Sequence, residues 1–199
     1  SGLITAVATM FEMGIIDNRG KFNTDLGTPR IRESEDGHEY VLAWKDMTSI
    51  ERDVVLTEID IDNLIRAKGA MYSGCMTLLS EIGLSIQDID RIIMSGGFGS
   101  YIDLEKTMTI GLLPEIDPEK VTFIGNGSLL GARMSALTNR IRSDVTDTLS
   151  RMTNFELSET NSFMDNFMAA MFLPHTDLEL FPRLKARLEE RQKQGNPEG

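Results

Sequence analysis

The sequence predicts an α/β fold, because two short apolar segments each run into a glycine-containing turn that is followed by a helix. Residues 92–94 lead into Ser95, Gly96 and Gly97, and about twenty-five residues later 121–124 lead into a second turn. β-branched residues favour strands, and strands that alternate with long helices are typical of α/β proteins. A strand that ends on glycines lets bare backbone approach a flat or anionic ligand.

The first third of the chain predicts a helix, then a β-hairpin excursion, then the longest helix. Residues 3–13 have helical apolar spacing and stop at Gly14. Residues 20–51 are polar and turn-rich with short strand-like runs, and 54–56 form a further short strand. Thr57 and Asp60 resemble a capping box, which opens a helix that extends to about Ile82.

The remaining elements alternate in the same way. We expect a helix at 103–111, which Asp103 and Glu105 cap and charge at its start, and a charged helix at 180–194 that opens at Pro182. Between them the pattern predicts a helix to about 141, a helix at 143–152, a short strand at 155–157 and a Met- and Phe-rich helix at 161–171.

The long helix carries one apolar stripe, and Lys68 falls on it. A lysine in such a place commonly extends its amine to solvent from a half-buried stem. The alternative is that Lys68 faces a cleft and meets an anionic or hydroxyl-bearing ligand, and the neighbouring residues do not decide between the two. The stripe, which we interpret as core with Cys75 as a small core residue, comprises Ile61, Leu64, Met71, Cys75, Leu78 and Ile82.

Composition excludes several classes of function. The formal net charge of −11 argues against nucleic acid or an anionic membrane as the main partner. No apolar run approaches the roughly 20 residues that span a bilayer. The single cysteine cannot form an internal disulfide or by itself hold a zinc ion or an iron–sulfur cluster. We therefore expect no metal site, and a reducing cytoplasm as the setting.

Other reactive side chains give no catalytic pattern. His38 and His175 each stand alone in polar or turn contexts, so a catalytic triad is not supported. In the helix at 161–171, methionines and phenylalanines recur at helical spacing. Core packing is the default interpretation of that spacing, and a groove for a partner protein is the alternative.

The two glycine turns also have two interpretations. Gly96 and Gly97 can simply connect a strand to a helix, and Gly125, Asn126 and Gly127 can simply allow tight helix packing. Alternatively, both turns form a backbone platform for the adenosine and phosphates of a nucleotide, assisted by the positive helix N-terminus that follows. The pattern lacks the Walker lysine and is not GxGxxG, so it fits neither a P-loop nor a Rossmann turn.

An ordered set of motifs resembles the C-terminal half of the reductive activators of corrinoid proteins. The match covers about residues 1–174, and the insertion around 25–30 and 42–44 resembles the branch found with methyltransferase systems. The chain begins within a helix and without an initiator methionine, so we expect it to be a piece of a longer protein. The matching segments are residues 1–4, 14–17, 67–70, 95–101, 110–114, 125–126, 131–133 and 169–174.

This resemblance implies a fold and a site. The family joins a [2Fe–2S] ferredoxin domain to an ATPase of the actin, sugar-kinase and chaperone superfamily, whose two ribonuclease-H-like lobes enclose ATP. The chain resembles the second lobe over residues 1–174, with an insertion at about 20–56 and a charged helix and tail at 175–199. It implies that Lys68 faces the adenosine. The implied adenosine motif is Ser95, Gly96, Gly97, Phe98 and Gly99, and the second connecting motif is Gly125, Asn126 and Gly127.

The resemblance also implies an activity. Such proteins return cob(II)alamin in a corrinoid methyl-carrier protein to cob(I)alamin, with ATP or ADP and magnesium in the ATPase. The four cluster cysteines and the first lobe are absent from this sequence, so we expect the chain alone to fold as a homodimer without useful activity. The alternatives are the lobe of another activator or a sugar kinase of the same superfamily, and a non-enzymatic docking module.

Overall fold

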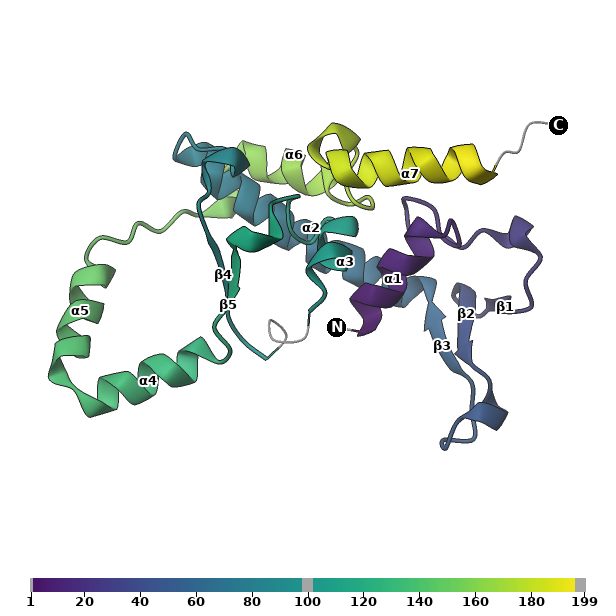
Figure 1. Ribbon diagram of the computed structural model, residues 1–199, viewed down its shortest axis with the longest axis horizontal. Helices are drawn as coiled ribbons and strands as arrows, with labels where there is room; N and C mark the ends of the chain where they lie inside the picture. The colour runs from purple at the N-terminus through teal and green to yellow at the C-terminus, as the bar shows by residue number, and fades with distance from the viewer. Residues whose placement is uncertain (1, 98–101, 196–199) are drawn as a thin grey trace.

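The structure is a computed structural model that describes residues 2–97 and 102–195. A long helix, α2 (Glu58–Glu81), connects an antiparallel sheet on one side to a parallel strand pair on the other, as Figure 1 shows. The other α-helices are α1 (Gly2–Glu12), α3 (Leu104–Thr109), α4 (Gly127–Leu137), α5 (Asn139–Leu149), α6 (Asn161–Ala169) and α7 (Pro182–Gly195). The strands are β1 (Ile31–Ser34), β2 (Gly37–Ala43), β3 (Val54–Thr57), β4 (Ile92–Met94) and β5 (Val121–Phe123).

The predicted hairpin excursion is a three-stranded antiparallel sheet of order β1-β2-β3. Ile31 pairs with Tyr40 and Ser34 with Gly37, so the β1–β2 connection is a tight turn. β3 pairs with β2, and the register shifts between Val41 and Ala43. The predicted strand at 54–56 is thereby confirmed as β3, and the chain continues from β3 directly into α2.

The predicted capping box at the start of α2 is confirmed. The Thr57 hydroxyl accepts a hydrogen bond from the Asp60 N–H at 3.1 Å, and the Asp60 carboxylate accepts one from the Thr57 N–H at 3.1 Å. Two of the otherwise unpaired N–H groups at this helix end are thus satisfied reciprocally.

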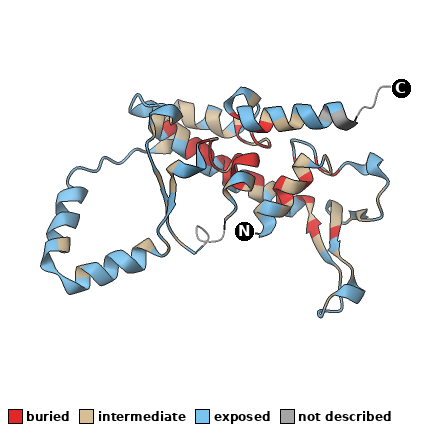
Figure 2. Ribbon diagram, viewed as in Figure 1, coloured by how far each residue is buried: buried red, intermediate tan, exposed pale blue. Residues whose placement is uncertain are grey.

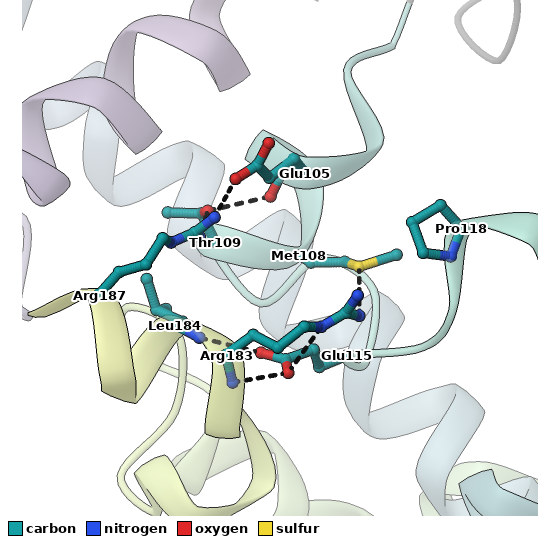
Figure 3. A pocket seen from close by; sticks show the side chains of 8 residues that line it. All are labelled: Glu105, Met108, Thr109, Glu115, Pro118, Arg183, Leu184 and Arg187. Carbon is teal, nitrogen blue, oxygen red and sulfur yellow. Dashed lines mark hydrogen bonds and ion pairs between the residues drawn. The ribbon is translucent and has the colours of Figure 1, made fainter.

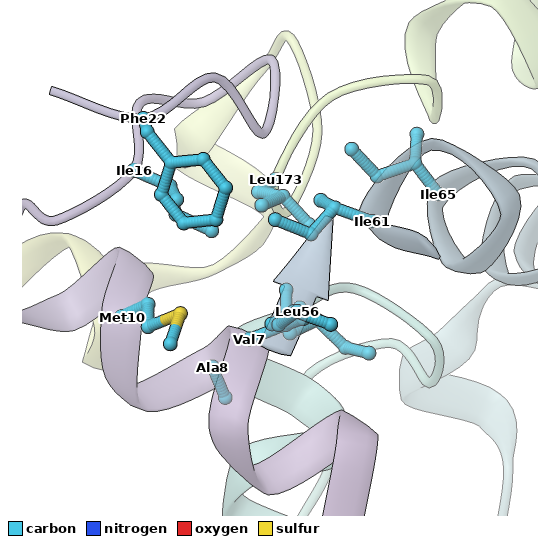
Figure 4. Close-up of a cluster of buried hydrophobic side chains, with 10 residues drawn as sticks. Val7, Ala8, Met10, Ile16, Phe22, Leu56, Ile61, Ile65 and Leu173 are labelled. Atoms are coloured by element: carbon cyan, nitrogen blue, oxygen red, sulfur yellow. The ribbon is translucent and has the colours of Figure 1, made fainter. Parts of the chain in front are cut away.

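The main core lies between α1, β3 and the first half of α2. Figure 4 shows its side chains, and Leu173 reaches it from the C-terminal part of the chain. Burial of each large apolar side chain contributes about 1.5–3 kcal/mol to folding, so this cluster fixes α1 against α2. Its members are Val7, Ala8, Met10, Ile16, Phe22, Leu56, Ile61, Ile65, Ile110 and Leu173.

The predicted buried stripe of α2 is wrong in its second half. Ile61 is buried as expected, but Met71, Leu78 and Ile82 are 45%, 43% and 56% exposed, and Cys75 is exposed as well. The second half instead buries Tyr72, which packs with Ala170, Phe181 and Leu184 against the C-terminal region. Helical spacing identified an apolar face correctly, but α6 packs on a different face of α2.

α4 and α5 form an arm that stands away from the rest of the chain, and neither helix contains a buried residue (Figure 2). The break between the two helices falls at Thr138, earlier than predicted, because the Thr138 backbone is extended and its hydroxyl accepts a hydrogen bond from the Arg140 N–H at 3.2 Å.

The strand expected at 155–157 is not formed. A 3₁₀ turn begins at Leu157 instead. The 3₁₀ turns within residues 2–97 and 102–195 are Thr24–Leu26, Lys45–Met47, Ile86–Asp88, Pro118–Lys120, Leu157–Glu159 and Leu178–Leu180.

The C-terminal region returns across the body of the chain. α6 packs along α2, and α7 lies over α3. Phe181 and Leu184, which follow Pro174 in the sequence, are buried, so the segment after residue 174 contributes to the core. Over residues 2–97 and 102–195, none of the helices has the length and apolar content that crossing a bilayer requires.

Candidate functional site

The two predicted glycine turns lie side by side. β4 and β5 are parallel, with Ile92 opposite Val121 and Met94 opposite Phe123, so both strands end at the same edge. The carboxyl ends of adjacent parallel strands are where open α/β sheets bind ligands. The spacing in the sequence therefore predicted correctly that the two turns meet.

Hydrogen bonds join the two turns directly. The Gly96 N–H donates to the Gly125 carbonyl at 2.7 Å, and the Gly127 N–H donates to the Ser95 hydroxyl oxygen at 3.0 Å. The Ser95 hydroxyl in turn donates to the Gly125 carbonyl at 3.3 Å. Ser95 is thus the side chain that connects the end of β4 to the start of α4, and the turns behave as one unit.

Two different structural constraints favour glycine at the positions of this unit. Gly96 and Gly125 have φ of +105° and +64°, a region that side-chain-bearing residues rarely adopt. A Cβ on Gly127 would lie 2.6 Å from the Ser95 oxygen, so the contact between the turns requires its absence. A Cβ on Gly96, Gly97 or Gly125 would meet no atom of residues 2–97 and 102–195 within 4 Å, so the described part of the chain leaves space beside these three residues.

Asn126 caps the helix that leaves the second turn. Its side-chain oxygen accepts from the Leu129 N–H at 2.9 Å, at the first turn of α4. A helix N-terminus carries a partial positive charge and favours an anion. Phe98 and Gly99, the other two residues of the predicted adenosine motif, lie outside the described residues.

Lys68 lies in neither of the two environments considered from the sequence, an amine in solvent or an amine that faces a cleft. Its side chain is fully buried, and its amine donates to the carbonyl oxygen of Phe172 and, at 2.6 Å, to that of Pro174. Burial lowers the pKa of the Lys68 ammonium to about 7. The amine extends neither to solvent nor into an open cleft, because these two carbonyls hold it.

Two aromatic residues that follow Pro174 in the sequence, His175 and Phe181, form a small aromatic cluster with Tyr72 of α2. The rings of His175 and Tyr72 are 5.4 Å apart, and Phe181 lies 5.9 Å from Tyr72. Burial and, next, the positive charge of Lys68 lower the pKa of His175. This histidine is therefore a half-buried residue that packs against Tyr72 and Phe181.

An apolar cavity of about 500 Å³ borders the turns and was missed by the sequence analysis. Its size falls within the range of small-molecule pockets. The signal was present, since part of its wall is the α2 stripe that we had interpreted as core. The cavity extends to Ser95 and is lined by Met71, Cys75, Leu78, Leu79, Ile82, Ile86, Ile89, Arg91, Ile92, Ile93, Met94, Ser95, Leu113 and Pro114.

A second cavity, of about 190 Å³, lies between α3 and α7 and is closed by ion pairs (Figure 3). Arg183 binds the Glu115 carboxylate at 3.0 Å and donates to the Ile116 carbonyl at 2.6 Å. Arg187 pairs with Glu105 in the same wall. Arg187 also donates to the Thr109 hydroxyl at 3.0 Å, and these contacts indicate a structural role in fixing α7 to α3.

Metal ligands are not gathered within the described ranges. No group of three or more His, Cys, Asp or Glu side chains in residues 2–97 and 102–195 has an arrangement that could hold an ion. The turn pair offers the bare backbone of its glycines and a helix N-terminus, whereas the Gly96 and Gly127 N–H groups and the Ser95 hydroxyl already bond between the turns. Bare backbone and a helix N-terminus are suited to an anionic or nucleoside ligand.

Comparison with known proteins places the chain in a family. Residues 1–185 match the family described as the C-terminal domain of RACo, the ASKHA domain. The chain belongs to this family. A solved structure, a reductive activator for a corrinoid, iron-sulfur protein, superposes with a TM-score of 0.85 at 46% identity over 91% of this chain and 29% of the other. The predicted fold class and the resemblance to corrinoid activators are thus confirmed.

Two curated relatives belong to the same group. The corrinoid activation enzyme RamQ of Eubacterium limosum is 31% identical over 179 residues, which are 84% of this chain and 30% of RamQ. The [Co(II) methylated amine-specific corrinoid protein] reductase of Methanosarcina barkeri is 31% identical over 115 residues, 57% of this chain and 21% of the reductase. The chain therefore spans less than a third of the length of either relative.

Proposed function

We propose that this chain supplies the nucleoside-holding half of an ATP-dependent reductive activator, which returns cob(II)alamin in a corrinoid methyl-carrier protein to cob(I)alamin. The names of both curated relatives and of the solved neighbour support the substrate class, since RamQ is named for corrinoid activation and the other two names refer to a corrinoid protein. They favour this hypothesis over a sugar-kinase lobe. The reduction needs a low-potential electron, so we assign the activity to the cytoplasm.

The paired turns carry the proposal. Three glycines face open space beside a helix N-terminus, and a ligand's adenosine and phosphates can approach bare backbone there. We assign nucleotide contacts to Ser95, Gly96 and Gly97 from the first turn, and to Gly125, Asn126 and Gly127 from the second. We do not retain Lys68 in this set, because its amine is already bonded to two carbonyls.

The residues present fit a nucleoside but not the other cofactors that the family implies. One cysteine cannot hold a [2Fe–2S] cluster, which needs four ligands. Among the described residues no three His, Cys, Asp or Glu side chains are grouped to hold an ion, and we assign no magnesium ligand to this chain. The electron must therefore come from elsewhere in the complete gene product or from another protein. In our proposal the chain's own residues bind the nucleotide and orient it.

Nucleotide can drive the uphill electron transfer only by binding one conformation of the activator–corrinoid complex better than another. The joined turns suit such a role, because a ligand that contacts both would bias the position of α4 relative to β4. The exposed apolar faces of α4 and α5 also support self-association of the chain as a homodimer.

The decisive variant is Gly97→Asp. Because a Cβ at Gly97 meets no atom of the described residues within 4 Å, we expect the substitution to leave the turn intact while placing a carboxylate against the nucleotide. Gly27→Asp is the matched control. It adds the same charge in the loop before β1, where a Cβ meets no atom of the described residues within 4 Å; the φ of Gly27 is +58°, a left-handed conformation that Asp adopts more readily than most residues.

The assay is cob(I)alamin formation, followed by absorbance. It contains the complete gene product that includes this chain, a cobalamin-loaded corrinoid carrier and a low-potential reductant. We expect cob(I)alamin to accumulate only when ATP is added, to be lost in Gly97→Asp and to be retained in Gly27→Asp. Equal formation without ATP would refute the ATP-dependent activity, and full activity of Gly97→Asp would refute the assigned site.

A further inference from the structure

A groove of about 410 Å³ lies between α2 and α6, away from the glycine turns. It combines two arginines with aromatic and methionine side chains, an unusual pairing on a chain of net charge −11. We call it the Arg–Phe groove, and its lining residues are Arg19, Asp62, Ile65, Arg66, Phe167, Met168, Met171 and Phe172.

The two arginines are available to a ligand. Both are exposed, and within residues 2–97 and 102–195 neither has a carboxylate within ion-pair distance. Asp62, the acid in the groove, lies 3.6 Å from Lys21 and pairs with it. The groove therefore presents a local positive charge whose counter-charge is not supplied by the surrounding protein.

The apolar wall contacts Arg19 and offers a contact surface of its own. The Arg19 guanidinium lies 5.8 Å from the centre of the Phe172 ring, a cation–π distance. Phe167 stacks on Phe163 with ring centres 6.2 Å apart, which fixes it on α6. Met168 is 60% exposed, so the methionines of this helix are only partly packed and their flexible thioethers can adapt to a partner.

We propose that the Arg–Phe groove docks an acidic segment of the partner protein, its carboxylates binding Arg19 and Arg66 and one of its apolar side chains entering between Phe167 and Met168. Charge complementarity carries the choice of occupant. An acidic partner would be repelled by most of this chain and attracted at the groove. Arginine recognises carboxylates through paired N–H donors, and methionine and aromatic residues are enriched in protein interfaces.

This inference deepens the proposed function, because the partner is the corrinoid methyl-carrier protein of that proposal. It also favours the alternative interpretation of the Met- and Phe-rich helix, a partner groove, over core packing. The groove would hold the carrier, while the glycine turns hold the nucleotide at a separate place on the chain.

The test compares two double variants of the complete gene product. Arg19→Glu with Arg66→Glu reverses both charges of the groove, and Arg140→Glu with Arg151→Glu makes the same change in net charge at exposed arginines elsewhere. Binding of the cobalamin-loaded carrier is measured by calorimetry. We expect the dissociation constant to rise at least about tenfold for the groove variant and less than about threefold for the control.

Two further measurements separate the apolar and electrostatic parts. Met168→Ser should weaken carrier binding by about threefold or more without changing the net charge. Raising the salt concentration should weaken the wild type and have a smaller effect on the groove variant, because exposed charge pairs are screened.

Four outcomes would overturn the docking site. The dissociation constant could be unchanged in the groove variant, or the wild type could fail to bind the carrier. The groove variant could lose ATP binding to the same extent as carrier binding, which would make the groove a nucleotide site. The groove variant could abolish self-association, which would make a second copy the occupant. Cob(I)alamin formation by the wild type is measured in parallel. If the wild type forms no cob(I)alamin, the proposed function is refuted. If cob(I)alamin forms while one of the four outcomes is observed, only the docking site is refuted.

Discussion

Replacement of Lys68 by methionine removes a side chain that joins α2 to the carbonyls of Phe172 and Pro174. Methionine fills a similar volume, so the main loss is two hydrogen bonds inside the protein. An unsatisfied buried carbonyl costs about 1–3 kcal/mol. We therefore expect Lys68→Met to lower the free energy of unfolding by about 2–4 kcal/mol at pH 9, where the wild-type amine is largely neutral.

The pH dependence has a definite sign. The pKa of Lys68 is about 7 in the folded protein and near the ordinary value of 10.5 in the unfolded chain. The unfolded state therefore binds more protons between these values, and stability rises with pH across that window. From pH 7 to pH 9 the wild type should gain about 2 kcal/mol from this group, at up to about 1.4 kcal/mol per pH unit.

The assay is urea unfolding of the chain, followed by circular dichroism at pH 7, 8 and 9. Lys68→Met should lack the increase, so its difference from the wild type should grow with pH. Lys45→Met, a change at an exposed lysine, should keep the increase. A flat wild-type profile, or an increase that survives in Lys68→Met, would refute the assignment of this titration to Lys68.

Three smaller predictions concern the packing of the chain, each measured by urea unfolding. Gly111→Ala should cost about 2–4 kcal/mol, because φ is +72° and the new Cβ would lie 2.2 Å from the Pro174 carbonyl oxygen; a cost below about 1 kcal/mol would contradict this contact. Glu12→Gln should cost about 1–2 kcal/mol, since the carboxylate lies 3.2 Å from the Arg187 guanidinium, and the cost should shrink in high salt. Leu137→Glu should change the stability of the monomer by less than about 0.5 kcal/mol, because Leu137 is 76% exposed on the arm; a larger loss at a protein concentration too low for self-association would show that the arm packs on its own chain.

Local signals in the sequence predicted the elements that depend on neighbouring residues. The capping box at Thr57 and Asp60 and the cap at Asp103 lie within three or four residues of the groups they satisfy. The meeting of the two glycine turns was also predictable, because two strands of one sheet that are linked by a helix commonly lie side by side. The candidate site follows from this one inference.

Contacts between distant segments explain what the sequence did not reveal. The partners of Lys68 are 104 and 106 residues away, so nothing near Lys68 indicates that its amine is bonded to carbonyls rather than exposed. The period of an amphipathic helix shows which residues share a face, but not what covers it. For that reason Met71 and Leu78 were interpreted as core, although they line an open cavity.

The most direct test of the account is calorimetric binding of ATP and ADP to the complete gene product, compared among the wild type, Gly97→Asp and Gly27→Asp. We predict that the wild type and Gly27→Asp bind nucleotide, and that Gly97→Asp binds it at least about tenfold more weakly. Equal affinity of Gly97→Asp and the wild type, or no binding by the wild type at millimolar nucleotide, would contradict the assignment of the paired turns as a nucleotide site.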